Sequence, residues 1–413
     1  MGQNDREFDL ILWGATGFTG QLVAEYLVAH YGPDSLRLAL GGRSESRLSA
    51  VRDRLGAPEL PLVLGDAGDD EKMASLAQRA RVVCTTVGPY ARYGSRLLSA
   101  CAAAGTHYCD LTGELHWIRH MLDAHQSQAE ASGARIVPTC GFDSIPSDLG
   151  VFFIQREVRS RYGAPSPHVK CGVAGFSGAF SGGTVASMLN MMDEGDADTS
   201  VRRIMADPYA INPEGERRGP EARDRTSPAY DADFEKWTAP FVMAGVNTRV
   251  VRRSAALLPD AYGPGFRYEE SMLTGKGPAG AAKATSVAAG MAAALGAMTI
   301  GPLRRLVAPR LPQPGDGPTP EQQEKGYWQF RLFADPPDVP GAAPLRARLK
   351  GDRDPGYGST AKMLAESAVC LALDPLGSAG GFHTPASAMG EALIDRLQQH
   401  AGVTFELVVH DFM

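Results

Sequence analysis

The feature of this chain that most constrains its fold is an apolar stretch that runs directly into a set of spaced glycines. Residues 8–13 read Phe-Asp-Leu-Ile-Leu-Trp, and glycines follow at positions 14, 17 and 20. An apolar run of this length that ends at a glycine is typical of a buried strand leading into a tight turn. Helical spacing of apolar residues begins after the turn, at Leu22, Val23, Tyr26 and Leu27. The pattern predicts a strand, a glycine turn and a helix.

A unit of this kind holds the pyrophosphate of a dinucleotide when a second strand follows at the right distance, and residues 36–40 supply that strand. The first glycine permits the turn, the second lets the backbone approach the phosphates, and the third lets the helix pack against the sheet. The helix N-terminus then faces the negative charge. An ordinary turn without a ligand is the alternative, and the surrounding pattern argues against it. The residues expected to form the site are Gly14, Ala15, Thr16, Gly17, Phe18, Thr19 and Gly20.

The turn after the second strand indicates which dinucleotide is bound. Sites that prefer NAD usually place Asp or Glu there, where the carboxylate binds the ribose hydroxyls and repels a 2′-phosphate. This chain instead has Gly41-Gly42-Arg43-Ser44. A guanidinium can bind a phosphate through two N–H groups and can stack on adenine, so Arg43 with Ser44 favours NADP(H). A solvated turn arginine is the alternative, and Arg47 is expected at the surface.

Strand and helix patterns alternate up to about residue 150, which is typical of a doubly wound parallel sheet of the Rossmann type. Expected strands cover 60–64, 81–87, 106–111 and 134–139, and expected helices cover 70–79 and 95–104. Ligands of such sheets bind beyond the carboxyl ends of the strands. We therefore expect Asp66 near the adenine, with a helix cap as its alternative role. The residues expected near the nicotinamide are Val87, Gly88 and Pro89.

The pattern changes after residue 150 and predicts a second, smaller α+β domain. We expect an NADP-binding domain at 1–150, a domain for substrate binding or homodimer formation at 151–350, and a helical segment at 351–413 that returns to the first domain. Within the second domain, the apolar stretches 169–176 and 248–252 are interpreted as short strands. The stretch 193–234 is rich in Asp, Glu, Arg and Pro and resembles a surface excursion.

Composition narrows the function classes. The chain has 413 residues and a net charge of −6, so it lacks the basic character of nucleic-acid-binding proteins. Its six cysteines include no Cys-x-x-Cys pair, and the N-terminus has no apolar signal region, which predicts reduced thiols and a cytoplasmic protein. His116, His120 and His125 lie close in sequence, but no cysteine or carboxylate completes a ligand set, so no metal is expected.

One segment is unusual, because no charged residue occurs between Lys283 and Arg304. Ala, Gly, Ser and Thr dominate it and contribute little to membrane insertion, which disfavours a transmembrane span. A buried or flexible helix and an interfacial helix are both compatible with the sequence. Arg304, Arg305 and Arg310 would anchor the interfacial form. A peripheral membrane contact through 284–310 is therefore among the expectations, and it would suit a lipid-like substrate.

Two familiar catalytic patterns do not occur in the sequence. Neither Tyr-x-x-x-Lys nor Gly-x-Ser-x-Gly is present, which argues against a short-chain dehydrogenase mechanism and a serine hydrolase. Hydride transfer driven by positioning remains, with one proton donor. The candidate donors are Tyr90, Asp110 and Asp143, together with Glu114 and Cys140.

Each candidate donor also has a structural alternative. These are a ring packed along the nicotinamide pocket for Tyr90, a helix cap for Asp110 and Glu114, an Asx-turn for Asp143 and simple burial for Cys140. The loop 176–184 either offers backbone amides to a substrate carbonyl or phosphate or only joins two domains.

Beyond the glycine turn and Gly42-Arg43-Ser44, short motifs occur along the whole chain. They are Val87-Gly-Pro-Tyr90, Tyr108-Cys-Asp-Leu-Thr-Gly-Glu114, Gly141-Phe-Asp-Ser-Ile-Pro-Ser-Asp148, Ser181-Gly-Gly-Thr184, Asp354-Pro-Gly-Tyr357 and Thr384-Pro-Ala386. With them the chain resembles the saccharopine dehydrogenase-like oxidoreductases, and within that family it is most similar to the bacterial trans-acting enoyl reductases of lipid and polyketide synthesis. The resemblance implies that NADPH reduces a carbon–carbon double bond on an acyl chain held by a separate synthase.

Other activities stay open, because a fold does not settle a function. Saccharopine reductases are expected to bind an amino-dicarboxylate through several basic side chains, and no such cluster can be identified in this sequence. The alternatives are a reductase acting on an imine or amino-acid substrate and a nucleotide-binding scaffold or sensor without turnover.

Overall fold

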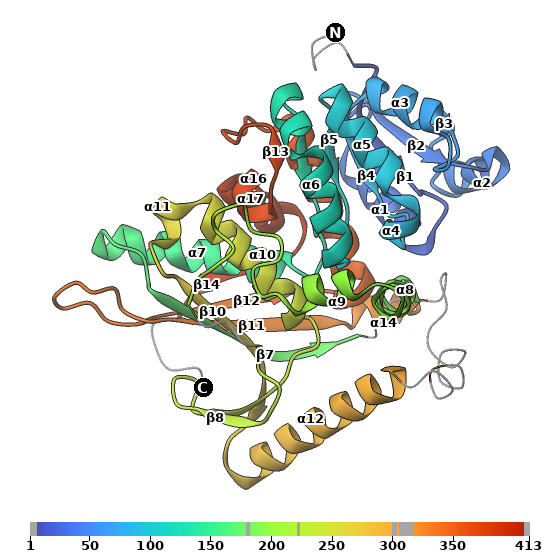
Figure 1. Cartoon of the computed structure of the whole chain (residues 1–413). Helices are drawn as coiled ribbons and strands as arrows, with labels where there is room; N and C mark the ends of the chain where they lie inside the picture. Colours follow the sequence, from blue (N-terminus) through green and yellow to red (C-terminus); the bar gives the residue numbers. More distant parts are fainter. Residues whose placement is uncertain (1–5, 179–181, 221–223, 300–303, 305–316, 409–413) are drawn as a thin grey trace.

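The structure is a computed structural model that describes residues 6–178, 182–220, 224–299, 304 and 317–408. The described residues form two seven-stranded sheets, sheet A at the upper right of Figure 1 and sheet B at the lower left. The strand order is β13-β6-β5-β4-β1-β2-β3 in sheet A and β14-β12-β11-β7-β10-β9-β8 in sheet B. The order of sheet A from β6 to β3 is that of a dinucleotide-binding Rossmann fold.

All neighbouring strands of sheet A run parallel. The strand order reverses between β1 and β4, where a ligand of such a sheet is expected. Its strands are β1 (Phe8–Trp13), β2 (Leu38–Gly42), β3 (Leu62–Leu64), β4 (Ala80–Thr85), β5 (His107–Cys109), β6 (Arg135–Val137) and β13 (Gly381–Phe382). The helices between them are α1 (Phe18–His30), α2 (Glu45–Arg54), α3 (Asp70–Arg79), α4 (Tyr90–Tyr93), α5 (Ser95–Ala104) and α6 (Leu115–Ser132).

Side chains of β1 point alternately into two hydrophobic cores, one on each face of sheet A. Leu10 and Leu12 belong to the cluster on the side of α1 and α15 (Thr360–Leu373), whereas Ile11 and Trp13 belong to the cluster on the side of α3, α5 and α6. Successive side chains of a strand point to opposite faces, so a strand covered by helices on both sides must be apolar throughout. This is why the apolar run 10–13 predicts the central strand, in which the buried Asp9 is paired with Arg37 and Arg81. The expected doubly wound sheet is confirmed.

Sheet B is mixed. Only β7 (His168–Ser177) and β10 (Arg267–Gly275) pair in parallel among its described strands, and the other pairs are antiparallel. The remaining strands are β8 (Ala229–Asp231), β9 (Lys236–Ala239), β11 (Tyr327–Ala334), β12 (Leu345–Gly351) and β14 (Val403–Leu407). The helices α7 (Ile145–Tyr162), α10 (Ala244–Leu257) and α11 (Pro259–Tyr262) lie over it, with α7 against β11 and β12 and α10 against β10.

The two sheets share elements near the expected domain borders. Residue 150 lies inside α7, which packs on sheet B. In the C-terminal segment 351–413, α15 packs against α1 and β4, and β13 pairs with β6 of sheet A. The last described strand, β14, instead pairs with β12 of sheet B, so this segment serves both sheets. Its other elements are the short turn η3 (Pro355–Ser359) and the helices α16 (Pro385–Ala388) and α17 (Gly390–His400).

Two expectations for the second domain are corrected. Residues 248–252 form part of the helix α10 and not a strand. Thr248, Val250 and Val251 favour strands locally, but the helical run extends to Leu257, and residues 247–254 are buried on all its faces. The stretch 193–234 is not only a surface excursion, because it contributes to α8 (Gly182–Ala197), α9 (Thr199–Ala206) and β8 and buries Val201, Ile211 and Phe234.

The uncharged segment forms α12 (Gly277–Thr299), which crosses the lower part of Figure 1 and contacts β9 and β10. By length and composition it could cross a membrane, and only 11% of its most apolar window is buried. Residues 300–303 and 305–310, including Arg305 and Arg310, lie outside the described residues. Arg304 forms ion pairs with Asp193 (3.0 Å) and Asp196 (3.3 Å) of α8, so its charge is already matched by protein carboxylates.

Candidate active site

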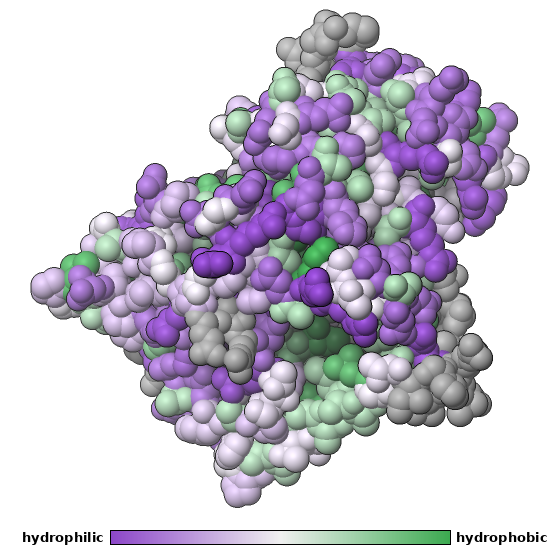
Figure 2. Space-filling view, in the orientation of Figure 1, coloured by the Kyte–Doolittle hydropathy of each residue, from purple (hydrophilic) through white to green (hydrophobic). Residues whose placement is uncertain are grey.

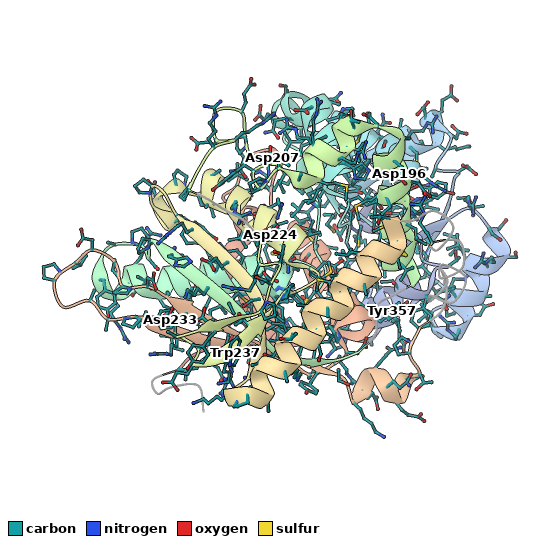
Figure 3. The ribbon with its side chains drawn as sticks, turned by 60° about the horizontal axis from the view of Figure 1, so that its bottom comes forward. Asp196, Asp207, Asp224, Asp233, Trp237 and Tyr357 are labelled. Atoms are coloured by element: carbon teal, nitrogen blue, oxygen red, sulfur yellow. The ribbon has the colours of Figure 1, made fainter. Side chains whose placement is uncertain are left out.

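The carboxyl ends of the strands of sheet A open into one large cavity of about 1190 Å³. Its opposite wall comes from α8, α9, the start of α10 and the C-terminal half of α12. Figure 3 shows Tyr357, a residue of η3, between α12 and sheet A. The lining residues from the sheet A side include Thr16, Gly17, Phe18, Arg43, Arg47, Asp66, Val87, Tyr90, Arg92 and Asp143, and those from the opposite wall include Ser187, Met188, Met191, Met192, Met205, Met243, Met291, Leu295 and Met298.

The glycine turn has the shape that the sequence predicts. Gly14 has φ +92°, and a Cβ there would come within 2.6 Å of Val87 Cγ2. A Cβ at Gly20 would collide with the carbonyl oxygen of Gly14. Gly17 begins α1 without a side-chain cap, which leaves amides of the first helical turn for a ligand at the cavity. Ala15 alone of the turn residues does not line the cavity, because it is fully buried in the core beside α1.

The turn after β2 brings two guanidinium groups to the cavity. Arg43 and Arg47 both line it and both are exposed. Ser44 does not line it, because its hydroxyl caps α2 by accepting a hydrogen bond from the backbone N–H of Arg47 at 3.4 Å. Arg47 lies one helical turn after Arg43, so the spacing of the two arginines was the signal that could have placed Arg47 in the site instead of on the surface.

The loops after β3 and β4 complete the sheet A side. Asp66 lines the cavity and accepts a hydrogen bond from the N–H of Gly68 at 2.8 Å, while α3 takes its cap from Asp69. The Thr86 hydroxyl donates to the carbonyl of Gly14 at 3.2 Å and joins this loop to the glycine turn. Val87 and Gly88 line the cavity; Pro89, joined to Gly88 by a cis peptide bond, instead begins α4.

An NADP dinucleotide fits these residues. The turn has no room for a side chain at Gly14 or Gly20, and the uncapped start of α1 suits a pyrophosphate. The guanidinium groups of Arg43 and Arg47 line the part of the cavity where a 2′-phosphate is expected to bind. The turn would hold the pyrophosphate, Arg43 and Arg47 the 2′-phosphate, and the loop at Val87 the nicotinamide side. When bound, the cofactor supplies a hydride.

Tyr90 lines the cavity with its ring, but its hydroxyl is engaged by the protein. The hydroxyl donates to the carbonyl of Thr85 at 3.2 Å and accepts from the N–H of Leu111 at 3.5 Å. Burial and the nearby Asp110 raise the pKa of Tyr90. This geometry suits a ring that shapes the pocket better than a proton donor.

Asp110, Glu114 and Cys140 lie behind the cavity wall and not in it. Asp110 accepts hydrogen bonds from the Tyr108 hydroxyl and the N–H groups of Thr112 and Thr139, and burial raises its pKa to about 7. Glu114 accepts from the N–H groups of Tyr90 and Ala91, so its carboxylate caps α4 and not its own helix α6. The thiol of Cys140 donates to the carbonyl of Val137 at 3.3 Å.

Asp143 is the remaining candidate, and it lines the cavity. It lies between β6 and α7, where Phe142 N–H donates to Thr360 Oγ1 and Ser144 Oγ donates to Asn247 Oδ1. No hydrogen bond among the described residues involves the Asp143 carboxylate, so the Asx-turn is not formed. Burial raises the pKa of Asp143 to about 6, which makes it a carboxyl group that can hold a proton near neutral pH.

Three polar contacts hold α8 against the sheet A side. Ser187 donates to Glu114 at 2.7 Å, Arg92 donates to Asn190 at 2.5 Å, and His116 contacts Glu194 at 2.6 Å. Of the loop 176–184, residues 179–181 lie outside the described part of the chain, while the Gly182 N–H donates to the Tyr357 hydroxyl at 3.1 Å. The Tyr357 ring in turn meets that of Phe18, at 4.7 Å between centroids.

Comparison with known proteins agrees with the geometry of the cofactor side. Residues 10–137 match the family model of the saccharopine dehydrogenase NADP-binding domain. This match spans the strands and turns from which the sequence predicts NADP(H), and it confirms that cofactor.

Curated relatives cover the whole length. A Mycobacterium tuberculosis protein provisionally named as a trans-acting enoyl reductase is 43% identical over 98% of this chain and 99% of its own. The trans-acting enoyl reductase of Mycobacterium leprae is 42% identical, with 98% of each chain covered. Among solved structures, the apo saccharopine dehydrogenase (L-Glu forming) of Saccharomyces cerevisiae aligns over 97% of this chain and 99% of its own, at 14% identity and a TM-score of 0.49.

Proposed function

The chain belongs to the saccharopine dehydrogenase-like oxidoreductases, in the group of the trans-acting enoyl reductases, and we propose that it uses NADPH to reduce a carbon–carbon double bond in an acyl chain carried by a separate synthase. In this reaction a hydride goes to one carbon of the double bond and a proton to the other. The protein must therefore position the acyl chain against the cofactor and supply one proton.

The observation that carries the proposal is the unequal charge of the cavity. The charged residues among the described lining are Arg43, Arg47, Asp66, Arg92, Arg96 and Asp143, all from the sheet A side. From Gly183 onward the described lining contains no Asp, Glu, Lys, Arg or His. An apolar acyl chain is compatible with such a wall, whereas a substrate carboxylate would lose its hydration there without gaining a cation.

Asp143 is the proposed proton donor. Its carboxyl group reaches the cavity without a protein partner among the described residues, and burial holds its pKa near 6. An acid of this pKa is partly protonated at neutral pH and transfers its proton readily. Tyr90 and Asp110, whose polar atoms are engaged elsewhere, act in this proposal as positioning residues for the loops beside the nicotinamide.

The alternatives differ in what they require of the same cavity. A reductase of an amino-acid or imine substrate needs cations for the substrate carboxylate. Besides Arg43 and Arg47, the described lining offers Arg92 and Arg96, but Arg92 donates a hydrogen bond to Asn190 and Arg96 is paired with Asp70. A scaffold or sensor without turnover needs no acid at the cavity, so the uncommitted carboxyl of Asp143 favours an enzyme.

Stopped-flow measurement of NADPH oxidation tests the proposal with a panel of enoyl thioesters, imines and keto acids. We expect oxidation with enoyl thioesters only. Oxidation with an imine or keto acid instead would establish the second function, and tight NADPH binding without oxidation by any of them would favour the scaffold.

The expected membrane contact is part of the same proposal. The exposed face of α12 presents Ala, Gly, Ser and Thr, among them Thr285, Ser286 and Ala289. It adjoins the cavity, which Leu295 of the same helix lines while remaining 46% exposed. A lipid surface at this face would bring the protein close to an apolar product or substrate.

A further inference from the structure

Methionine is concentrated in the cavity to a degree that the composition does not explain. The chain has 14 methionines, and half of them line this one cavity, although its lining comprises fewer than a tenth of the residues. They come from four separate elements: three from α8, one from α9, one from the residue before α10 and two from α12. Helical spacing places Met188, Met191 and Met192 on one face of α8, but only the fold brings that face together with the methionines of the other elements.

Six of these methionines, all except the buried Met298, differ from those of the core. Met73 and Met363 are fully buried by neighbouring apolar side chains, whereas Met188, Met191 and Met192 are only half-buried and face the cavity. Apolar surface left open to a cavity costs free energy unless a ligand covers it. Figure 2 shows hydrophobic residues gathered in a hollow above α12 on this face of the molecule.

The wall has a chemistry that suits a flexible hydrocarbon. A methionine side chain is unbranched, has three rotatable bonds and carries a polarizable sulfur, so it adapts to ligands of variable shape. Walls of Val, Ile or Phe would fit one shape and exclude others. A surface built from methionines on four elements can accommodate acyl chains of different lengths and methyl branches.

We infer that the methionine-lined wall, formed by α8, α9, α12 and the start of α10, binds the alkyl part of a long acyl thioester. The inference rests on the proposed function for the thioester itself, which lies at the other side of the cavity beside Asp143 and the cofactor turn. The wall then selects long over short chains. The hydrogen bonds that hold α8 through Ser187 and Asn190 keep three of its methionines at a fixed distance from the cofactor side.

Binding of saturated thioesters tests this without turnover. The probes are palmitoyl- and butyryl-N-acetylcysteamine, titrated into the NADP-loaded protein by calorimetry. Wild type is expected to bind the palmitoyl probe at least about ten-fold more tightly, since each buried methylene contributes favourably. Met192→Gln keeps the side-chain length and the helix propensity of the residue. Its affinity for the palmitoyl probe should fall roughly ten-fold, because the amide must be desolvated against the alkyl chain. Its affinity for the butyryl probe should fall less than about two-fold.

Met121→Gln is the matched control. Met121 is a half-buried methionine of α6 outside the cavity, so its replacement should leave both affinities unchanged. Unchanged NADPH affinity in both variants shows that they are folded.

Chain-length-dependent binding of saturated probes by a protein that reduces no enoyl thioester would support the alkyl wall and contradict the reductase. Reduction of enoyl thioesters with equal affinity for both chain lengths, or equal losses in Met192→Gln and Met121→Gln, would overturn the inference.

Discussion

The carboxylate of Glu114 accepts a hydrogen bond from the hydroxyl of Ser187 at 2.7 Å, and so joins the wall that lines the substrate side to the sheet that holds the cofactor. The same carboxylate accepts from the backbone N–H groups of Tyr90 at 2.8 Å and Ala91 at 2.9 Å. Glu114 is fully buried, as is Tyr90, whereas Ala91 and Ser187 are half-buried. Glu114 therefore links the two sides of the cavity, and its accepted hydrogen bonds favour a structural role over proton donation.

Replacing Glu114 by Ala should lower the free energy of unfolding by about 2–3 kcal/mol, because it leaves buried backbone N–H groups without an acceptor. Ser187→Ala removes only the hydroxyl and should cost about 1 kcal/mol or less. Urea denaturation of both variants measures the difference. Equal losses in the two variants would show that Glu114 does not carry the backbone contacts.

The pKa of Asp143 gives the proposed reaction a pH dependence. If Asp143 donates the proton, its protonated form is the active one, so kcat should be constant below about pH 6 and fall about ten-fold per pH unit above it. Single-turnover rates with saturating NADPH and an enoyl thioester, measured from pH 5 to pH 9, follow this limb. In Asp143→Asn the rate should be low and the limb absent.

Tyr90→Phe provides the contrast to that variant. It removes the hydroxyl that contacts Thr85 and Leu111 but keeps the ring in the pocket. We expect a loss of stability near 1 kcal/mol and an unchanged pH limb. A limb that disappears in Tyr90→Phe and persists in Asp143→Asn would reverse the two roles.

Membrane contact through α12 is testable with liposomes. Lys283 is its single charged residue and lies near its start, so anionic vesicles should retain the protein weakly and high salt should release it. Ala289→Glu places a charge on the exposed face and should abolish retention in a flotation assay. Release by detergent alone would indicate insertion rather than surface binding.

The cofactor side could be predicted from sequence because its signals are local. The run 8–13 and the three glycines lie within one stretch, and the positive φ of Gly14 and the contact of Gly20 with the Gly14 carbonyl arise within that stretch. Only the contact of Gly14 with Val87 depends on a residue far along the chain. Arg43 follows the next strand directly. The expected strand at 248–252 was wrong for the opposite reason. The local preference of Val and Thr for strands was overridden by tertiary packing, because residues 247–254 are buried in a helix that contacts both α7 and β10.

The substrate side could not be predicted, because its residues are far apart in the chain. Met188, Met243 and Met291 meet only through the arrangement of α8, α10 and α12. Asp143 was identified as a candidate among five, but sequence cannot show that Glu114 and Asp110 point their polar atoms into the protein. Burial and hydrogen bonding, which depend on the whole fold, separate these carboxylates.

The glycine turn gives a prediction with an internal control. Gly17 has an ordinary φ of −75°, and a Cβ there would meet only the Gly14 carbonyl, at 3.4 Å, so Gly17→Val should fold. Its branched side chain would occupy the approach of the pyrophosphate, and NADPH affinity should fall at least about ten-fold. Gly20→Ala should instead displace the turn itself and lower stability as well as affinity. Unchanged NADPH affinity in a folded Gly17→Val variant would remove the cofactor from this turn.

Arg43 allows the sharpest test, because it concerns one side chain and one phosphate. Its hydrogen bonds to the 2′-phosphate should contribute roughly 1.5–3 kcal/mol, or one to two decades of NADPH affinity. Arg43→Asp adds like-charge repulsion and should strongly weaken the binding of NADPH, while NADH affinity stays unchanged or improves as the carboxylate reaches the ribose hydroxyls.

Isothermal titration of both nucleotides, with Arg47→Ala for comparison, measures the effect. Arg47 also lines the cavity, so its loss should weaken NADPH by a smaller factor and leave NADH unaffected. Equal losses of NADPH and NADH affinity in Arg43→Asp would mean that Arg43 shapes the turn and does not read the phosphate.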